Sequence, residues 1–151
     1  MKDKRLSVSA IKNGTVIDHI PAEVLFKVVS ILKLDTIDNM ITIGNSLESG
    51  KLGKKGIIKL SEVFFHDNEI NKIAMVAPCA KLNIIRNYEV ADKRVVQIPD
   101  EIVGIVKCVN PKCITNNEDV TTRFTVVSKS EIKLRCHYCE KITDRDNIQI
   151  T

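Results

Sequence analysis

Four of the five cysteines in this chain fall into two tight clusters near its C-terminus, CVNPKC (108–113) and CHYC (136–139). Their pattern is C-x4-C-x22-C-x2-C. Two short loops of this kind can bring four thiolates to one tetrahedral Zn²⁺ at about 2.3 Å. We therefore predict one structural zinc ion per chain, with Cys108, Cys113, Cys136 and Cys139 as its ligands.

Disulfide bonds between the same cysteines are the alternative. The N-terminus, MKDKRLSVSA, lacks the apolar segment of a secretory signal. No apolar run approaches the ~18 residues that a membrane span requires. We therefore expect a cytoplasmic protein without membrane contact, whose thiols stay reduced and available to a metal.

A site with four thiolate ligands leaves no open coordination position for water or substrate, so this zinc is expected to be structural and not catalytic. His137 lies inside the second cluster but is expected at the surface, because four cysteines already complete the coordination shell. Cys79 has no partner nearby in the sequence and is expected to be a small buried apolar residue.

The first part of the chain shows strand and helix patterns in alternation. Helical spacing of apolar residues follows Pro21 and recurs in FFHDNEINKIAMVAP. Extended patterns occur at 6–20, 40–47, 56–60, 82–87 and 88–93. The order β-α-β-β-α-β predicts an α+β chain: a ferredoxin-like domain at 1–97, with an antiparallel sheet and two helices on one face, and then a small all-β zinc-binding domain at 98–151.

Charge and composition argue against a nucleic-acid-binding surface. The net charge of +4 is spread along the chain, with 15 Lys/Arg against 12 Asp/Glu in residues 1–100 and 8 against 7 in residues 101–151. Aromatic residues make up 4% of the chain and there is no Trp, so a base-stacking platform would be sparse. A zinc-ribbon nucleic-acid-binding protein remains the alternative that the cysteines alone would favour.

The segment GTVIDHIP (14–21) places Asp18 directly before His19, which raises the possibility of a catalytic dyad. Adjacent residues of a regular strand point to opposite faces of the sheet, so Asp18 would be poorly placed to orient His19. The other two possible roles for this pair are a ligand contact and simply the polar end of a strand.

Together these features resemble one known family, the regulatory chain of aspartate carbamoyltransferase. The resemblance covers nearly the whole chain. The stretches that carry it are AIKNGTVIDHIPA (10–22), KVVSIL (27–32), ITIGNSLESGKLGKKGIIKL (41–60), VAPCAKLNIIRNYEV (76–90) and the four-cysteine pattern.

The resemblance implies a non-catalytic chain that regulates an enzyme of pyrimidine biosynthesis. It implies that residues 1–97 form a homodimer and bind the nucleotide effectors CTP and ATP. It also implies that residues 98–151 dock onto the catalytic chain, so that regulatory dimers link catalytic trimers.

Carried over residue by residue, the resemblance implies an effector site. Lysine cations can meet phosphate oxygens, Asp18 can accept hydrogen bonds from ribose hydroxyls, and the backbone near Val8–Ile11 can read a base edge. The implied residues are Val8, Ser9, Ala10, Ile11, Asp18, His19, Lys55, Lys59, Asn83, Tyr88, Val90 and Lys93.

Some positions depart from the family's pattern. Ser9 stands where better-known members carry Glu, which removes a negative charge near the nucleotide and leaves the choice between CTP and ATP open. Arg5 stands where they carry Lys. In the zinc domain Asn110 and Glu140 match the family's contacts to the catalytic chain, whereas Lys112 replaces an Asn.

Overall fold

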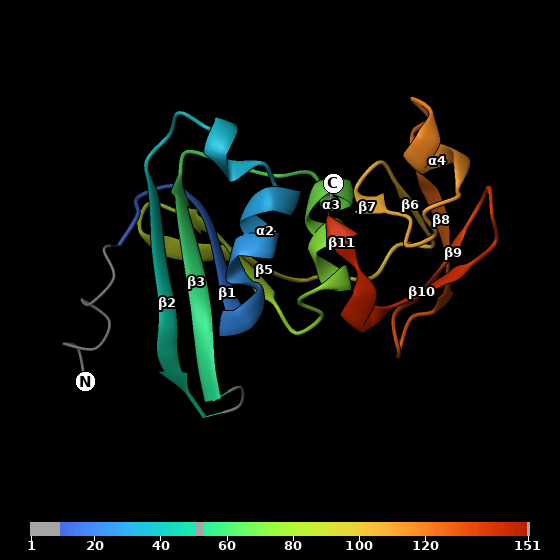
Figure 1. Cartoon of the computed structure of the whole chain (residues 1–151). Helices are drawn as coiled ribbons and strands as arrows, with labels where there is room; N and C mark the ends of the chain where they lie inside the picture. Colours follow the sequence, from blue (N-terminus) through green and yellow to red (C-terminus); the bar gives the residue numbers. More distant parts are fainter. Residues whose placement is uncertain (1–9, 51–52, 151) are drawn as a thin grey trace. The chain divides into compact units, whose positions relative to one another are not determined.

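In this computed structural model, which describes residues 10–50 and 53–150, the chain divides after Gln97. We call residues 1–97 the N-terminal unit and residues 98–151 the C-terminal unit. Figure 1 shows the N-terminal unit in blue to yellow-green and the C-terminal unit in yellow to red. Within the described ranges, no helix has the length and apolarity of a membrane-crossing segment.

The N-terminal unit is built on one five-stranded sheet in the order β2-β3-β1-β4-β5, with every neighbouring pair antiparallel. The first four strands have the ferredoxin-like order, and β5 extends the sheet at one edge. The strands are β1 (Gly14–Pro21), β2 (Ile41–Ser49), β3 (Gly53–Ser61), β4 (Lys81–Arg86) and β5 (Glu89–Val95). The predicted fold class is therefore confirmed.

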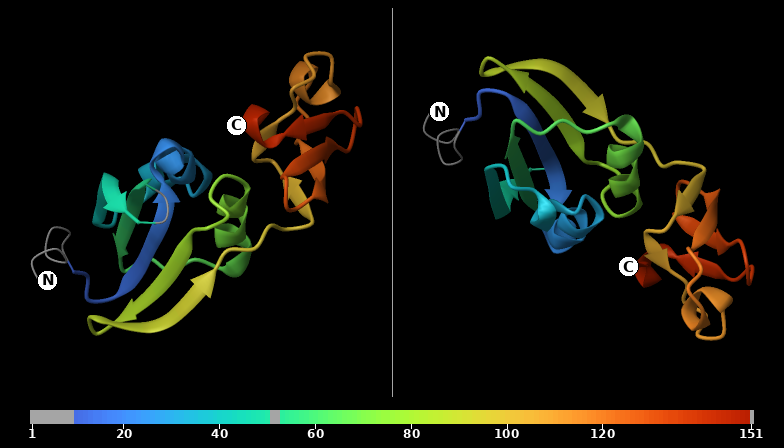
Figure 2. Two further views of the ribbon diagram at one scale, coloured as in Figure 1. Left: turned by 90° about the horizontal axis from the view of Figure 1, so that it is seen from below. Right: turned by 90° about the horizontal axis from the view of Figure 1, so that it is seen from above.

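Short helices cover one face of this sheet (Figures 1 and 2). The helical segments are η1 (Ala22–Val24), α2 (Leu25–Ile31), η2 (Leu34–Thr36), α3 (Asp67–Ile70) and η3 (Asn71–Met75). Ile17, Ile58 and Leu82 stand in one row across the three central strands and are buried, as are Leu25 of α2 and Ile73 of η3. This apolar layer fixes which face of the sheet is covered.

The second predicted helix is shorter than its apolar pattern suggested. It consists of one α-helical turn that passes into a 3-10 segment. The carboxylate of Glu69 accepts a hydrogen bond from the backbone N–H of His66 at 2.9 Å, which caps the first turn of this helix.

The expectation that Cys79 is buried is wrong, because its side chain is exposed. The N–H of Ala80 donates to the carbonyl of Ala77 at 3.1 Å and closes a turn. Pro78 and Cys79 are its two central residues, and they project to solvent while both flanking alanines are buried.

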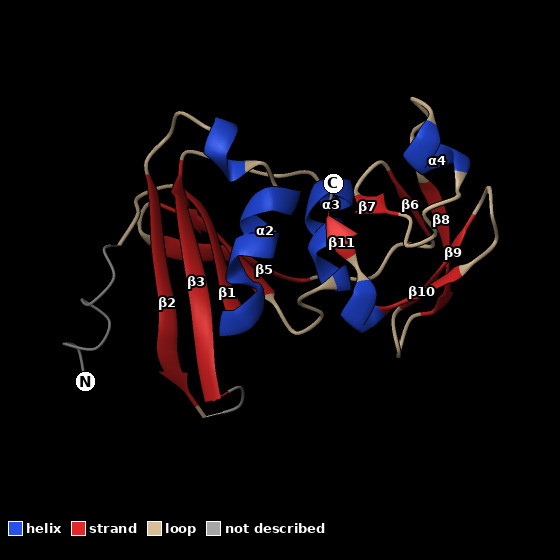
Figure 3. Ribbon diagram, viewed as in Figure 1, coloured by secondary structure: helices blue, strands red, loops and turns tan. Residues whose placement is uncertain are grey.

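The C-terminal unit consists of short strands and short helical turns (Figure 3). One sheet has the order β10-β9-β8-β6, and a second pairs β11 with β7. The elements are β6 (Glu101–Val103), β7 (Val106–Lys107), α4 (Ile114–Asn117), β8 (Arg123–Ser128), β9 (Lys133–Cys136), β10 (Ile142–Asp144), η4 (Arg145–Asn147) and β11 (Gln149–Ile150). The small core of this unit includes Phe124, Leu134, Ile102, Ile132 and Val106.

Candidate functional site

A row of side chains crosses the sheet of the N-terminal unit on the face opposite to the helices. Strand register aligns one residue from each of the five strands: Thr42, Lys59, Val16, Asn83 and Lys93. The neighbouring row contains the buried Ile17, Ile58 and Leu82, so alternation turns the first row away from the helices. Three residues implied by the resemblance, from three strands, thus share one face.

A bulge in β5 adds Val90 to this face. The pairing of β4 with β5 shifts between Ile84 and Ile85, which leaves Ala91 as the extra residue. Val90 and Lys93 are three residues apart, and the bulge lets both side chains face the same side. Tyr88 lies in the turn between the strands, with a φ of 69° and a side chain that is 65% exposed.

A second bulge, in β1, shapes the surroundings of Asp18 and His19. His19 has a φ of 60°, and the pairing of β1 with β3 shifts between Ile17 and Ile20. The regular alternation assumed from the sequence therefore fails at this pair. The backbone N–H of His19 donates to the Asp18 carboxylate at 2.6 Å, and His19 Nδ1 lies 3.8 Å from the other carboxylate oxygen.

Lysines bring positive charge to the Asp18 carboxylate. Lys55 Nζ of β3 lies 2.9 Å from Asp18 Oδ1, and both side chains are about four-fifths buried. Burial lowers the pKa of Lys59, and the negative charge of Asp18 partly offsets that shift. The arrangement is an acceptor flanked by two cations, which suits a ligand that carries both phosphate and hydroxyl groups.

The remaining implied residues lie at or before the start of β1. Ala10 is exposed and Ile11 is partly exposed, both a few residues before Gly14. Val8 and Ser9 lie outside the described residues.

The four clustered cysteines of the C-terminal unit meet at one point. Their Sγ atoms all lie within 4.8 Å of one another, with 3.6 Å between Cys108 and Cys139 and 3.7 Å between Cys113 and Cys136. Four thiolates at about 2.3 Å from a tetrahedral Zn²⁺ would be about 3.8 Å apart, whereas a disulfide requires about 2.05 Å. The spacing and donor chemistry thus fit a metal ion. His137 is outside the cluster and exposed.

The environment of the cluster shifts the pKa values of its thiols in different directions. Burial raises the pKa of Cys108 to about 12, and burial also raises the pKa of Cys136. Burial acts in the same direction on Cys139, but hydrogen bonds from the Lys141 backbone and the Asn110 side chain lower its pKa to about 7. A divalent cation would supply the charge that stabilises the thiolates.

Amide side chains of α4 support the first cysteine loop, a feature that the sequence reasoning missed. Asn116 Nδ2 donates to the carbonyls of Cys108 and Asn110 at 2.9 and 2.7 Å. Asn117 Nδ2 donates to the carbonyls of Pro111 and Cys113 at 3.0 and 2.8 Å. The signal was the pair of asparagines directly after the loop, since Asn favours bonds to nearby backbone over regular helix.

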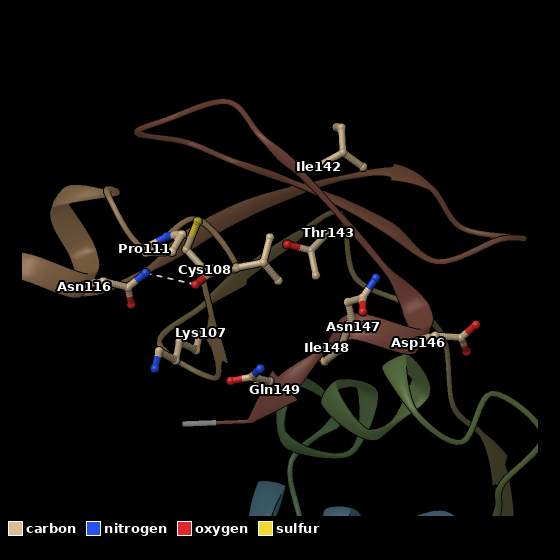
Figure 4. A pocket seen from close by; sticks show the side chains of 11 residues that line it. Lys107, Cys108, Pro111, Asn116, Ile142, Thr143, Asp146, Asn147, Ile148 and Gln149 are labelled. Carbon is tan, nitrogen blue, oxygen red and sulfur yellow. Dashed lines mark hydrogen bonds between the residues drawn. The ribbon is translucent and has the colours of Figure 1, made fainter.

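Beside this loop lies an open pocket of about 620 Å³ (Figure 4). Its wall includes Cys108, Asn116, Ile148 and Thr143, and the figure shows the Asn116 bond to the Cys108 carbonyl. The Thr143 hydroxyl is buried without a hydrogen-bond partner among the described residues. The pocket is therefore a polar indentation next to the cysteine cluster.

A ferredoxin-like unit joined to a small four-cysteine unit defines a class of two-domain, metal-binding chains. Residues 6–97 match the family described as "Aspartate carbamoyltransferase regulatory chain, allosteric domain". Residues 100–149 match "Aspartate carbamoyltransferase regulatory chain, metal binding domain". The chain belongs to the aspartate carbamoyltransferase regulatory chain family, whose members are the non-catalytic subunits of that enzyme.

Curated relatives named aspartate carbamoyltransferase regulatory chain are similar along almost their whole length. The relative from Bacteroides fragilis is 59% identical over 145 residues, covering 96% of this chain and 95% of its own. The relative from Parabacteroides distasonis is 54% identical, with 99% and 97% covered. That from Thermococcus sibiricus is 51% identical, with 96% of each chain covered. The family accounts for both units, which a zinc-ribbon nucleic-acid-binding protein does not.

Proposed function

We propose that the open sheet face of the N-terminal unit binds nucleotide effectors such as CTP and ATP and thereby regulates the catalytic chain. The observation that carries this proposal is the row in which Lys59, Asn83 and Lys93 share one face around Val16. Separate strands supply these groups, so the sheet holds them in place before a ligand arrives.

Each group has a chemical role in this proposal. Lys59 and Lys93 bind phosphate oxygens, and Asn83 offers both a donor and an acceptor to polar groups of the nucleotide. Asp18 accepts hydrogen bonds from ribose hydroxyls, with Lys55 holding its carboxylate at 2.9 Å. The backbone near Ala10 and Ile11 reads the base edge.

The test is Lys93→Ala in the assembled enzyme. Loss of one charge-assisted phosphate contact, worth about 1.5–3 kcal/mol, should weaken nucleotide affinity roughly ten-fold or more by calorimetry. Lys27→Ala is the matched control, because Lys27 is an exposed lysine on α2, in the helical layer. Unchanged nucleotide affinity in Lys93→Ala would show that the effector site lies elsewhere.

We further propose that the C-terminal unit binds one structural Zn²⁺ through Cys108, Cys113, Cys136 and Cys139 and docks onto the catalytic chain. The metal, when bound, would cross-link the two cysteine loops of a unit that has only a small core of its own. Asn110 and Glu140, which match family contacts to the catalytic chain, lie on those loops. A reducing cytoplasm would keep the thiols available.

Chelation tests this second role. Removal of the metal should release the regulatory chains from the catalytic trimers in size-exclusion chromatography, and added Zn²⁺ should restore the complex. An intact complex after metal analysis shows complete loss would contradict it.

Pairing of two N-terminal units into a homodimer completes the proposal. Among the described residues β2 is at a sheet edge and exposes Ile43, and an exposed sheet edge is a surface suited to a second copy. Ile43→Lys should reduce the molar mass of the isolated chain from dimer to monomer in light scattering. If this variant remains a dimer, the interface must lie on another surface.

A further inference from the structure

The end of the N-terminal unit is tied to its helical layer at two points. The Arg94 guanidinium of β5 contacts the Asp67 carboxylate of α3, with 2.6 Å between Nη1 and Oδ1. Three residues further on, the backbone N–H of Gln97 donates to Asn71 Oδ1 of η3 at 3.1 Å. These bonds fix the segment from which the chain leaves the unit.

These contacts add little to the free energy of unfolding. Their main effect is to fix the position of the segment by which the chain leaves the unit. The side chains of Asp67 and Arg94 are 75% and 39% exposed, and ion pairs in water add little net free energy. Arg94 Nε also lies 3.1 Å from the Asp92 carboxylate. Asp92 belongs to the same strand, so this contact does not connect β5 to the helical layer. The bonds to Asp67 and Asn71, in contrast, connect β5 and the segment after it to the helical layer.

Strand β5 links this anchor to the proposed effector face. Lys93 stands in register with Asn83 on the open face, and Arg94 stands in register with the buried Leu82 on the helical face. One strand therefore carries a cation for the effector and, at the next residue, the anchor of the chain exit. A force on Lys93 acts directly on the neighbouring anchored residue.

The strand is also free to shift. Among the described residues it is an edge strand paired with β4; it contains the Ala91 bulge and is exposed along most of its length. A pocket of about 430 Å³ is lined by Asp67, Asn71, Arg94 and Gln97, so there is open space beside the anchored segment. Segments with few buried contacts move at the lowest free-energy cost.

We propose that β5 transmits effector binding to the C-terminal unit, and that Asp67 and Asn71 are positioning residues that set where the chain leaves the N-terminal unit. This rests on the proposed function, because it requires the effector to bind at Lys93. An effector on the open face shifts β5, and the two anchors convert that shift into a defined displacement of Gln97. Without these two bonds, a shift of β5 would be lost in the segment between β5 and Gln97 and would not displace Gln97 in a defined way.

The test uses the enzyme assembled from this chain and its catalytic chain, with Asp67→Asn/Asn71→Ala in the regulatory chain. CTP and ATP affinities are measured by calorimetry, and activity is measured at saturating nucleotide. We expect affinities within about two-fold of wild type and a response of activity that is reduced about two-fold or more, the scale of coupling changes along such elements. A merely structural role would not separate affinity from response in this way.

Asp92→Asn is the matched control, because it removes the in-strand partner of Arg94 and should preserve the response; Asp67→Glu should preserve it as well. Where the double variant fails to assemble, the single variants Asp67→Asn and Asn71→Ala provide the same comparison. A full response in the anchor variants would overturn the inference, as would a parallel loss of affinity. Failure of the wild-type chain to bind either nucleotide would instead overturn the proposed function.

Discussion

Cys113 and Cys79 show how one residue type takes two roles in this chain. Cys113 is buried within the cluster, and Cys79 is exposed in a turn. We expect Cys113→Ser to abolish metal retention and unfold the C-terminal unit, because a bound structural zinc contributes about 10 kcal/mol or more to folding. Cys79→Ser should retain one metal per chain and an unchanged melting temperature. Metal analysis and calorimetry check both, and full metal content in Cys113→Ser would rule out the four-thiolate site.

Metal affinity should depend steeply on pH. The raised pKa values of Cys108, about 12, and of Cys136 mean that both thiols carry protons at pH 7 in the metal-free chain. Binding must release these protons, so acid competes with the metal and affinity rises as pH rises. Because two protons are released on binding, the Zn²⁺ dissociation constant should fall by at least about 100-fold for each unit that the pH rises between pH 6 and 8. Competition with a chromophoric chelator measures this slope, and a flat profile would exclude release of both protons.

The backbone conformation and the close neighbours of Gly14 both require a glycine at this position. Its φ is 145°, and an added Cβ would overlap the carbonyl oxygen of Leu60, which belongs to a backbone that cannot move aside. We expect Gly14→Ala to destabilise the N-terminal unit by about 2 kcal/mol or more. Gly50→Ala is the control, since nothing lies within 4 Å of its added Cβ. Thermal unfolding of both variants checks this, and equal melting temperatures would contradict it.

At the scale of secondary-structure elements, the α4 turn supports the first cysteine loop through side-chain hydrogen bonds. Asn116→Ala removes two hydrogen bonds to that loop, and loss of such support typically weakens metal binding by about 10- to 100-fold. Ile114→Ala changes an exposed side chain of the same turn and should leave affinity unaffected. Metal competition assays distinguish the two variants. Equal affinities would show that the loop is held by the metal alone.

Strands were predictable where side-chain pattern alone decides them. The extended patterns at 6–20 and 56–60 correspond to β1 and β3, and the cysteine spacing predicted the cluster. The bulges at Asp18–His19 and at Ala91 were missed, because each depends on pairing with a distant strand and leaves no local signal. The turn that exposes Cys79 is different, because it is local and Pro78 at its first central position was a signal that could have predicted it.

The length of the second helix illustrates a related limit. Helical periodicity in 67–77 fits an α-helix, yet the segment passes into 3-10 geometry from Asn71. Asn71 turns its side chain to the Gln97 backbone, a tertiary contact that the local pattern could not reveal. The choice between CTP and ATP could not be predicted from the sequence either, because Ser9 departs from the family's residue at that position. Ser9 also lies outside the described residues.

At the scale of the whole molecule, the division after Gln97 predicts separable stability. Removal of the metal should abolish the unfolding transition of the C-terminal unit and leave that of the N-terminal unit, whose core contains Ile17 and Leu82 and no metal ligand. Calorimetry with and without chelator measures this, and nucleotide titration of the metal-free chain should give an unchanged affinity. Simultaneous loss of both transitions would show that the units fold as one.

The exposed turn at Cys79 has a practical consequence. The other four thiols are engaged in the proposed metal site and at least partly buried, so a maleimide dye added to the metal-loaded protein should react at Cys79 alone. Because Cys79 sits two residues before β4, a donor dye there and an acceptor placed on the catalytic chain would report nucleotide-driven rearrangement as a change in energy transfer. The wild-type thiol can thus serve as a spectroscopic handle for regulation.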